Sequence, residues 1–500
     1  MADNSQRGGW RVRAAVLLGV LLLIAATTHQ TSAQQVTDER VNAAVARLDT
    51  LATDALERTG VPGIAVAVVY KGQVVYLNGF GVREAGTEAR VDADTVFQLA
   101  SLSKPVASTV VAAVVGDGQF SWDDPIVKHE PTFAMYEPWV TSQVTARDMF
   151  AHRSGLPDHA GDLLEDIGYD REQVLHRLRY QRPASSLRSE YAYTNFGLTA
   201  GAVAAARAAG RSWEDLSAER LYQPLGMTST SSRFADYAAA PNRALTHALV
   251  DGRYVAEYTR DADAQSPAGG VSSSVRDMAR WLRLQLGNGT VDGQQIVSGE
   301  ALVETHRPQM IRSQAAYPAT GRAGFYGLGW NVSYDAAGRL QLSHSGAFEL
   351  GAGTTTYLIP AEEIGIVVLT NGAPRGTAEA VALSFLDLAL TGTLERDYLT
   401  LLPPAFAAEF VPNYGTTVDY ASPPANPGAP LSLSAYTGTY ENDFWGEIEV
   451  AEADGGLVLL AGPNKIPFAM HHWDRDTFLF QPTGENAYGP SGVMFEIGPD

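Results

Sequence analysis

A serine and a lysine three residues apart form the first pair in the chain with complementary side-chain chemistry. Ser101 and Lys104 stand just before an apolar run, 106–115, that predicts a buried helix. Side chains at this spacing lie on one face of a helix, so the hydroxyl and the amine should be neighbours. A serine hydroxyl becomes a nucleophile when a base takes its proton, and a lysine is such a base if burial keeps its amine neutral.

Lysine is rare in this sequence, which singles out Lys104. The four lysines stand at positions 71, 104, 128 and 465, within a total of 36 lysines and arginines. Arginine does not release its proton at neutral pH, so a lysine in an arginine-rich chain suits a position that needs a removable proton. The alternative is structural: Ser101 caps a helix, and Lys104 is an exposed residue of its first turn.

A tyrosine and an asparagine further along form a second candidate group. Tyr193 and Asn195 lie at a predicted bend before the apolar run 198–206, from which both side chains can point into one cleft. A phenol whose pKa is lowered by a lysine ammonium can shuttle a proton, and an amide can hold a substrate carbonyl or the lysine. The structural alternative is a packed ring and a helix cap.

A histidine followed by Ser345, Gly346 and Ala347 forms the third group. Alternating apolar residues predict a strand over 339–343 that ends at His344, with Gly346 where the backbone must approach a neighbour closely. A strong hairpin signal follows, with strands over 351–358 and 364–371 on either side of a turn.

These groups need a scaffold of helices and strands. With 500 residues, 45% of them hydrophobic and 18% charged, the chain is globular in composition and long enough for two or three folded units. One helix is expected over 39–59, then a hairpin of strands over 64–70 and 73–79, and a mostly helical insertion up to about residue 280. The predicted fold class is α/β (α+β), an antiparallel sheet flanked by helices, followed by a small all-β, barrel-like domain.

Charge and the N-terminus limit the location and the partners. A net charge of -20 disfavours nucleic acid and anionic membranes, and the lack of cysteine excludes disulfides and thiolate metal sites. Residues 1–33 resemble a signal peptide, with arginines at 7, 11 and 13, an apolar core over 14–26 and small residues before Gln34. The alternative is an uncleaved membrane anchor. We expect a periplasmic or secreted protein, with no stable membrane insertion after cleavage.

The last part of the chain predicts a separate domain. Prolines mark a stiff linker over 396–431, and short strands are expected over 433–441, 446–453, 456–460, 467–473 and 477–481. Because the chain stops soon after a further strand-like run, we expect a missing last strand or closure by a partner chain, which would allow an oligomer through this domain. His471 and His472 are adjacent and face opposite sides of a strand, so we expect no metal site and no cofactor.

The three groups together resemble the serine β-lactamase and penicillin-binding-protein family. They are most similar to its class C β-lactamase-like branch, which includes family VIII carboxylesterases and D-stereospecific aminopeptidases. The resemblance covers about residues 36–393, and stretches at 149–157, 268–271 and 327–330 also follow the family's order. It implies a hydrolase domain over 34–395, and the segment 432–500 resembles the lipocalin-like tail domain that follows many of these hydrolases.

The resemblance also implies residue roles. Ser101 would be the nucleophile, Lys104 its general base and Tyr193 the proton relay to the leaving group. Asn195 would touch the substrate, and the backbone amides of Ser101 and Ala347 would form the oxyanion hole. The implied activity is hydrolysis of an ester, a D-amino-acid peptide or amide, or a β-lactam through an acyl-serine. The alternative is a penicillin-binding or sensor protein that is acylated without efficient turnover.

The third group departs from the penicillin-hydrolysing pattern. That pattern has a lysine before Thr-Gly, whereas this chain has His344. A neutral histidine attracts a substrate carboxylate less strongly, which favours esters or peptides with a free amino end and leaves His344 to assist proton transfer. An arginine from a loop, such as Arg153 or Arg182, would restore the attraction.

Overall fold

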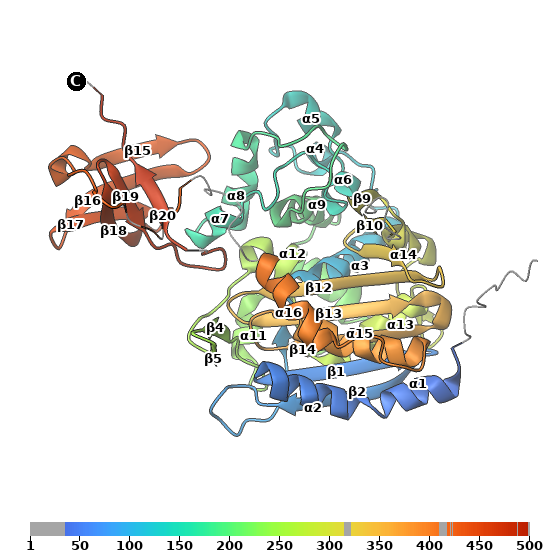
Figure 1. Ribbon diagram of the computed structural model, residues 1–500. Coiled ribbons are helices and arrows are strands. Elements are labelled where there is room, and N and C mark those ends of the chain that lie inside the picture. The colour runs from blue at the N-terminus through green and yellow to red at the C-terminus, as the bar shows by residue number, and fades with distance from the viewer. Residues whose placement is uncertain are drawn as a thin grey trace, which may run out of the picture. The chain divides into compact units, whose positions relative to one another are not determined.

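The computed structural model describes residues 36–314, 322–409, 418–420, 422, 424–487 and 489–498. The predicted signal peptide lies outside these residues. An eight-stranded antiparallel sheet forms the centre of the first part of the chain (Figure 1), in the order β2-β1-β14-β13-β12-β11-β10-β9. Its strands are β1 (Gly63–Tyr70), β2 (Gln73–Gly81), β9 (Met310–Ser313), β10 (Gly324–Tyr326), β11 (Asn331–Tyr334), β12 (Leu340–Phe348), β13 (Ala352–Ile359) and β14 (Ile364–Thr370).

The central strands of the sheet are buried on both faces, and the side chains of β1 alternate between two cores. Ile64, Val66 and Val68 pack with helices α1 (Asp38–Val45), α2 (Leu48–Thr59) and α15 (Thr377–Leu390). The residues between them, Ala65 and Ala67, face the opposite core, which includes α3 (Ser103–Gly116) and α13 (Val275–Leu286). Two faces of helices around one antiparallel sheet confirm the predicted fold class.

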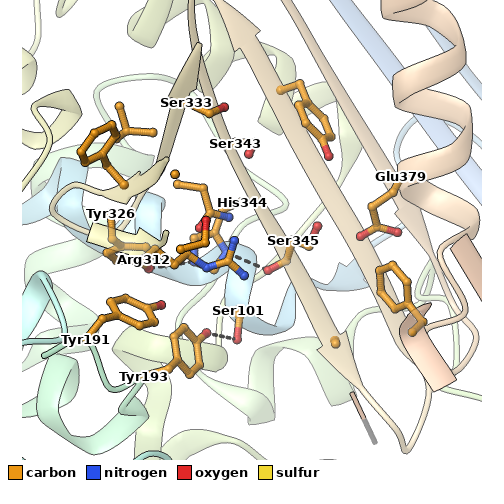
Figure 2. Close-up of a pocket in the computed structure, with 18 of the residues that line it drawn as sticks. Ser101, Tyr191, Tyr193, Arg312, Tyr326, Ser333, Ser343, His344, Ser345 and Glu379 are labelled. Carbon is orange, nitrogen blue, oxygen red and sulfur yellow. Dashed lines mark hydrogen bonds between the residues drawn. The ribbon is translucent and has the colours of Figure 1, made fainter. Parts of the chain in front are cut away.

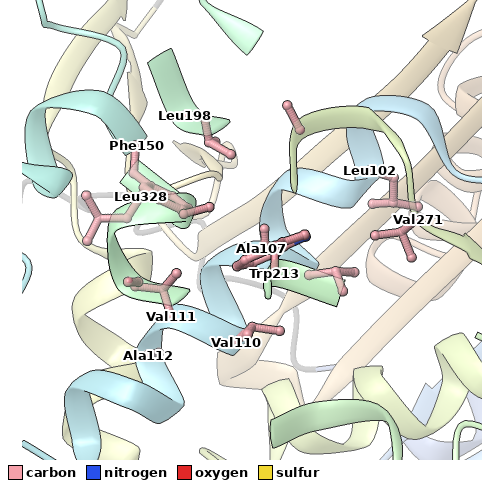
Figure 3. Packing of buried hydrophobic residues seen from close by; sticks show 14 of the residues in the cluster. Leu102, Ala107, Val110, Val111, Ala112, Phe150, Leu198, Trp213, Val271 and Leu328 are labelled. Carbon is pink, nitrogen blue, oxygen red and sulfur yellow. The ribbon is translucent and has the colours of Figure 1, made fainter. Parts of the chain in front are cut away.

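A mostly helical insertion continues the second core. Figure 3 shows Ala107, Val110 and Val111 of α3 packed near Phe150 and Trp213. Because α3 is buried along nearly its whole length, the residues at its start are fixed in place. The other helices of the region are α4 (Ile126–His129), α5 (Pro138–Gln143), α6 (Ala146–Phe150), α7 (Asp162–Asp166), α8 (Arg171–Arg177), α9 (Asn195–Ala208), α10 (Trp213–Ser217), α11 (Phe234–Ala239), α12 (Ser266–Gly269) and α14 (Gly299–His306).

Short strand pairs connect these helices. They are β3 (Phe97–Gln98) with β6 (Ser272–Ser273), β4 (Ala248–Val250) with β5 (Arg253–Val255), and β7 (Thr290–Val291) with β8 (Gln294–Gln295). The first of these pairs is the one that leads directly into the turn that carries Ser101.

The C-terminal part is a six-stranded antiparallel meander with its own core. Its strands pair in chain order: β15 (Gly438–Asn442), β16 (Gly446–Ala453), β17 (Gly456–Ala461), β18 (Ile466–Asp474), β19 (Thr477–Phe480) and β20 (Ser491–Met494). Tyr436, Phe468 and Phe478 are among the residues of that core. Within the described residues β15 and β20 do not pair, so the sheet is a half-barrel.

Three predicted elements differ from the structure. The helix expected over 39–59 is two helices, broken at Ala46 and Arg47, where neither glycine nor proline marks the break. Residues 433–435 form a single turn, so the first tail strand starts later than predicted. Part of the predicted linker is the helix α16 (Tyr398–Glu409), because Leu402 and Phe406 pack against Gly376 at the start of α15. No helix among the described residues is long and apolar enough to cross a membrane.

Candidate active site

Ser101 lies in a single 3-10 turn, Ala100–Leu102, between β3 and α3. Ala100 has a φ of 48°, in the left-handed region that costs a non-glycine residue about 1–2 kcal/mol. Thr354 Oγ1 holds the turn from β13 by donating a hydrogen bond to the backbone oxygen of Leu99 at 2.7 Å. The turn leaves Ser101 partly exposed at a pocket while its neighbours on both sides are buried.

Strand β12 passes so close to this turn that only a glycine fits there. A Cβ on Gly346 would lie 2.0 Å from the Leu99 oxygen and 2.9 Å from the Leu102 nitrogen, which confirms the predicted close approach. The expectation that the strand ends at His344 was wrong, because β12 continues to Phe348 by pairing with β13. The oxyanion hole from the amides of Ser101 and Ala347 stays a prediction.

Lys104 is fully buried, and its Nζ lies 3.0 Å from Ser101 Oγ. Nζ donates to Asn195 Oδ1 at 2.7 Å and to the backbone oxygen of Ala268 at 3.0 Å. Both atoms only accept hydrogen bonds. A neutral amine has two N–H bonds and one lone pair, so these two acceptors use both hydrogens and leave the lone pair facing Ser101. The alternative of an exposed Lys104 was therefore wrong.

The charge state of Lys104 suits the role of a base. Burial lowers the pKa of Lys104 to about 7, although the nearby charge of Asp162 opposes the shift. A substantial fraction of the amine is therefore neutral near neutral pH, and can take a proton from Ser101.

Tyr193 approaches the same oxygen from the other side, donating a hydrogen bond to Ser101 Oγ at 2.8 Å (Figure 2). The expectation that a lysine ammonium lowers the pKa of this phenol was wrong: burial raises the pKa of Tyr193 well above its usual range, and Lys104 Nζ lies over the ring, 4.5 Å from its centroid. Tyr193 is therefore a neutral phenol that donates its proton.

Aromatic rings produce the burial of Tyr193. The His152 ring lies 4.6 Å from the Tyr193 ring and 4.8 Å from the Tyr326 ring, centroid to centroid. The centroids of the Tyr191 and Tyr326 rings are 5.5 Å apart. His152 and Tyr326 come from segments far from Tyr193 in the sequence, so the environment of Tyr193 is a product of the tertiary fold.

His344 is buried and both of its ring nitrogens have partners. Nδ1 lies 2.7 Å from the backbone oxygen of Ser345, which only accepts, so Nδ1 carries the hydrogen. Nε2 then accepts from the Tyr326 hydroxyl at 2.8 Å. Burial and the charge of Lys104 lower the pKa of His344 to about 3, so the ring is neutral at working pH. His344 lines the pocket but does not hydrogen-bond to Ser101, so its predicted help in proton transfer lacks a direct contact.

Three pocket residues were missed by the sequence analysis: Asp162, His159 and Arg312. Asp162 Oδ2 accepts from Asn195 Nδ2 at 2.7 Å and lies 2.7 Å from His159 Nδ1. His159 and Asp162 follow directly after the 149–157 stretch, which is the one sequence signal that could have identified them. No motif marks Arg312.

Arg312 on β9 is the arginine that enters the pocket. Arg153 instead pairs with the buried Asp148 at 2.8 Å, and Arg182 lies 6.0 Å from the ring centre of Tyr136. Burial raises the pKa of Tyr191, and a hydrogen bond from Arg312 opposes that shift. Figure 2 draws Arg312 beside Tyr191 and His344. Across the described ranges no carboxylate forms an ion pair with Arg312, which leaves its charge available to a ligand.

Within the described part of the chain, no group of three or more histidines and carboxylates is arranged to hold a metal ion. The arrangement brings together a hydroxyl, a buried amine that can accept its proton, a phenol that can donate one, and a guanidinium at the pocket.

Comparisons with known proteins agree with this geometry. The model of the Beta-lactamase family matches residues 48–391, and that of a domain of unknown function, DUF3471, matches residues 422–500. The chain is 26% identical over 438 residues to the Unguisins hydrolase ungD of Aspergillus violaceofuscus, covering 81% of this chain and 76% of that protein. It is 25% identical over 369 residues to the D-alanyl-D-alanine-carboxypeptidase/endopeptidase AmpH of Escherichia coli, covering 73% and 92%.

A solved structure shares the fold. The octameric penicillin-binding protein homologue from Pyrococcus abyssi has a TM-score of 0.59 at 20% identity, over 90% of this chain and 96% of that chain. The matched family region contains Ser101, Lys104 and Tyr193, which the structure brings together at one oxygen. The chain is a serine hydrolase that belongs to the beta-lactamase family.

Proposed function

We propose that the protein cleaves an ester or peptide bond in two steps, by transferring the acyl group to Ser101 and then releasing it with water. The observation that supports this proposal is the placement of Ser101 Oγ between Lys104 Nζ at 3.0 Å and the Tyr193 hydroxyl at 2.8 Å. One group accepts the nucleophile's proton and the other donates, which are the two proton movements that acyl transfer needs.

The first step forms a bond between Ser101 Oγ and the substrate carbonyl carbon. The Ser101 proton moves to the lone pair of Lys104, which the two acceptor contacts hold in that direction. As the tetrahedral adduct collapses, the bond to the leaving oxygen or nitrogen breaks, and Tyr193 supplies the proton that the leaving atom takes up. The first step leaves an ammonium at Lys104 and a phenolate at Tyr193. In the second step water attacks the acyl-serine carbonyl carbon and gives its proton to the Tyr193 phenolate, while Ser101 Oγ leaves and takes its proton back from Lys104.

We propose that the substrate carries a free carboxylate that binds to Arg312. His344 is neutral, but Arg312 supplies the cation that the third motif lacks. The proposal therefore replaces the preference inferred from His344 alone, for esters or peptides with a free amino end, by a preference for substrates with a free carboxylate. A relative is named a D-alanyl-D-alanine-carboxypeptidase/endopeptidase, which agrees with a peptide that ends in a carboxylate. We also propose that the protein works in the periplasm or outside the cell, from the signal-peptide pattern of residues 1–33.

The test uses one peptide in two forms. N-acetyl-D-alanyl-D-alanine and its C-terminal amide differ only in the carboxylate, and kcat/KM is measured for both with the wild type, Arg312→Gln and Arg182→Gln. Arg312 is exposed, so we expect about a tenfold loss, equivalent to about 1.4 kcal/mol, for the free acid in Arg312→Gln. The amide should be unaffected, and Arg182→Gln, outside the pocket, should affect neither form.

Two results would contradict the proposal. Equal losses for acid and amide would mean that Arg312 supports the pocket without binding the carboxylate. Stoichiometric labelling of Ser101 by a fluorescent penicillin, without turnover of peptides, nitrophenyl esters or a chromogenic cephalosporin, would favour the alternative of a protein that is acylated and not released.

A further inference from the structure

A carboxylate and an imidazole lie directly behind Asn195. Asp162 is the first residue of α7, and its side chain is 4% exposed. Its Oδ2 accepts from Asn195 Nδ2 and contacts His159 Nδ1, each at 2.7 Å, whereas its Oδ1 is buried without a partner in the described structure. Buried carboxylate oxygens without partners are costly, so such a group in a catalytic pocket needs a reason.

We propose that Asp162 and His159 form a positioning pair that orients the Asn195 amide and thereby keeps the lone pair of Lys104 on Ser101. The inference rests on the proposed function, since it explains how the base of that reaction is held ready. Neither residue contacts Ser101 through a hydrogen bond, so both act through others.

The orientation follows from the two unlike ends of an amide. Asp162 only accepts, so it must face the donor end of Asn195, and this turns the acceptor end, Oδ1, toward Lys104. With the amide reversed, its NH₂ group would face Nζ, and Ala268 would be the one remaining carbonyl partner. The lone pair of Lys104 would then be free to accept from Asn195 in place of Ser101.

Charge adds a second effect of the pair. The negative charge of Asp162 favours the ammonium form of Lys104 and so opposes the effect of burial on the pKa of Lys104. Burial alone would lower the pKa of His159, but its hydrogen bond to Asp162 and the charges of Asp162 and Asp158 outweigh burial and raise the pKa of His159. A protonated His159 offsets the charge of Asp162, so the two residues influence Lys104 in opposite directions.

Other titratable and charged groups face this cluster. They are Asp158 beside His159, Glu165 of α7 with its ion-pair partner Arg260, and Tyr191, Tyr193, His152, His344 and Arg312 around the pocket. None of them hydrogen-bonds to Asn195 within the described residues, so Asp162 alone selects the direction of that amide.

The experiment measures the rate of Ser101 labelling by a fluorophosphonate between pH 5 and 9, which reports activation of the serine whatever the substrate. The labelling rate should rise with pH as Lys104 loses its proton, and we call this rise the acid limb of the profile. Asp162→Asn keeps an acceptor for Asn195 and removes the negative charge that favours the Lys104 ammonium, so the acid limb should move to lower pH by about half a unit or more. Asp162→Ala also removes the acceptor, so its plateau should lie at least about tenfold below that of Asp162→Asn. His159→Gln removes the offsetting cation and should move the limb to higher pH.

The control is Asp94→Asn, at an exposed ion pair with Arg276 outside the pocket, which should leave the profile unchanged. Thermal unfolding of each variant tests whether it is folded. Equal plateaus for the two Asp162 variants with no shift of the limb would overturn the inference. Labelling with the expected shifts, in a wild type that turns over no substrate, would contradict the proposed function and leave the positioning pair supported.

Discussion

The buried amine of Lys104 must make the stability of the protein depend on pH in a defined window. An unfolded lysine has a pKa near 10.5, and burial lowers the pKa of Lys104 to about 7 in the folded protein. Between these values the unfolded state binds one proton more than the folded state, so the free energy of unfolding rises with pH. Below about pH 7 the amine is protonated in both states, and above 10.5 it is neutral in both, so the contribution is constant there.

The slope follows from the size of the shift. One proton contributes about 1.4 kcal/mol per pH unit, so about 3 kcal/mol accumulates between pH 7 and 9. Lys104 is 0% exposed, so solvent screening does not reduce this figure. Lys104→Met removes the titrating group and keeps a side chain of similar length, and the difference in unfolding free energy between wild type and variant isolates the contribution of Lys104.

The assay is urea unfolding at pH 7, 8 and 9, followed by tryptophan fluorescence. The buried rings of Trp281 and Trp330 stack with centroids 5.5 Å apart and report on the hydrolase core. The matched control is Lys128→Met, because the Lys128 side chain is 57% exposed. If the difference in unfolding free energy between wild type and Lys104→Met does not change with pH, as expected for the control, then the amine is charged in the folded protein and cannot be the base.

Three further changes test other contacts of the site. Tyr193→Phe removes the hydroxyl 2.8 Å from Ser101 and should lower kcat about 100-fold with little change in KM, in steady-state hydrolysis of N-acetyl-D-alanyl-D-alanine, whose leaving amine needs a proton. A full kcat would contradict the donor role. Gly346→Ala places a Cβ 2.0 Å from the Leu99 oxygen and should destabilise the fold by about 1–3 kcal/mol, measured as a lower melting temperature. An unchanged melting temperature would refute this expectation. His344→Ala leaves the Tyr326 hydroxyl without its acceptor and should cost about 1–3 kcal/mol of stability in urea, whereas equal stability would show that water replaces the contact.

The sequence predicts those parts of the site that depend on local geometry. Ser101 and Lys104 share a helix face, and Tyr193 and Asn195 are two residues apart at a helix start, so spacing alone places each pair. The hairpin of β1 and β2 and the strand pair β13 and β14 were also predicted correctly from alternation and turn residues.

Long-range contacts account for what the sequence did not predict. Burial raises the pKa of Tyr193, and the rings packed against it belong to His152 and His159, which lie in another segment, so a local argument gave the wrong direction. Arg312 reaches the pocket from the last strand of the sheet order, a position fixed by strand pairing. The helix α16 forms despite internal prolines because its apolar side chains pack on α15, and tertiary burial outweighs local propensity.

The burial of Lys104 has a practical consequence for handling the protein. Its other lysines, Lys71, Lys128 and Lys465, have side chains that are 55%, 57% and 58% exposed. Among the lysines, amine-directed reagents such as succinimidyl esters for attaching dyes or solid supports should therefore react at these three surface sites and leave the amine beside Ser101 untouched. With so few lysines, a protein immobilised in this way would be held in a small number of defined orientations.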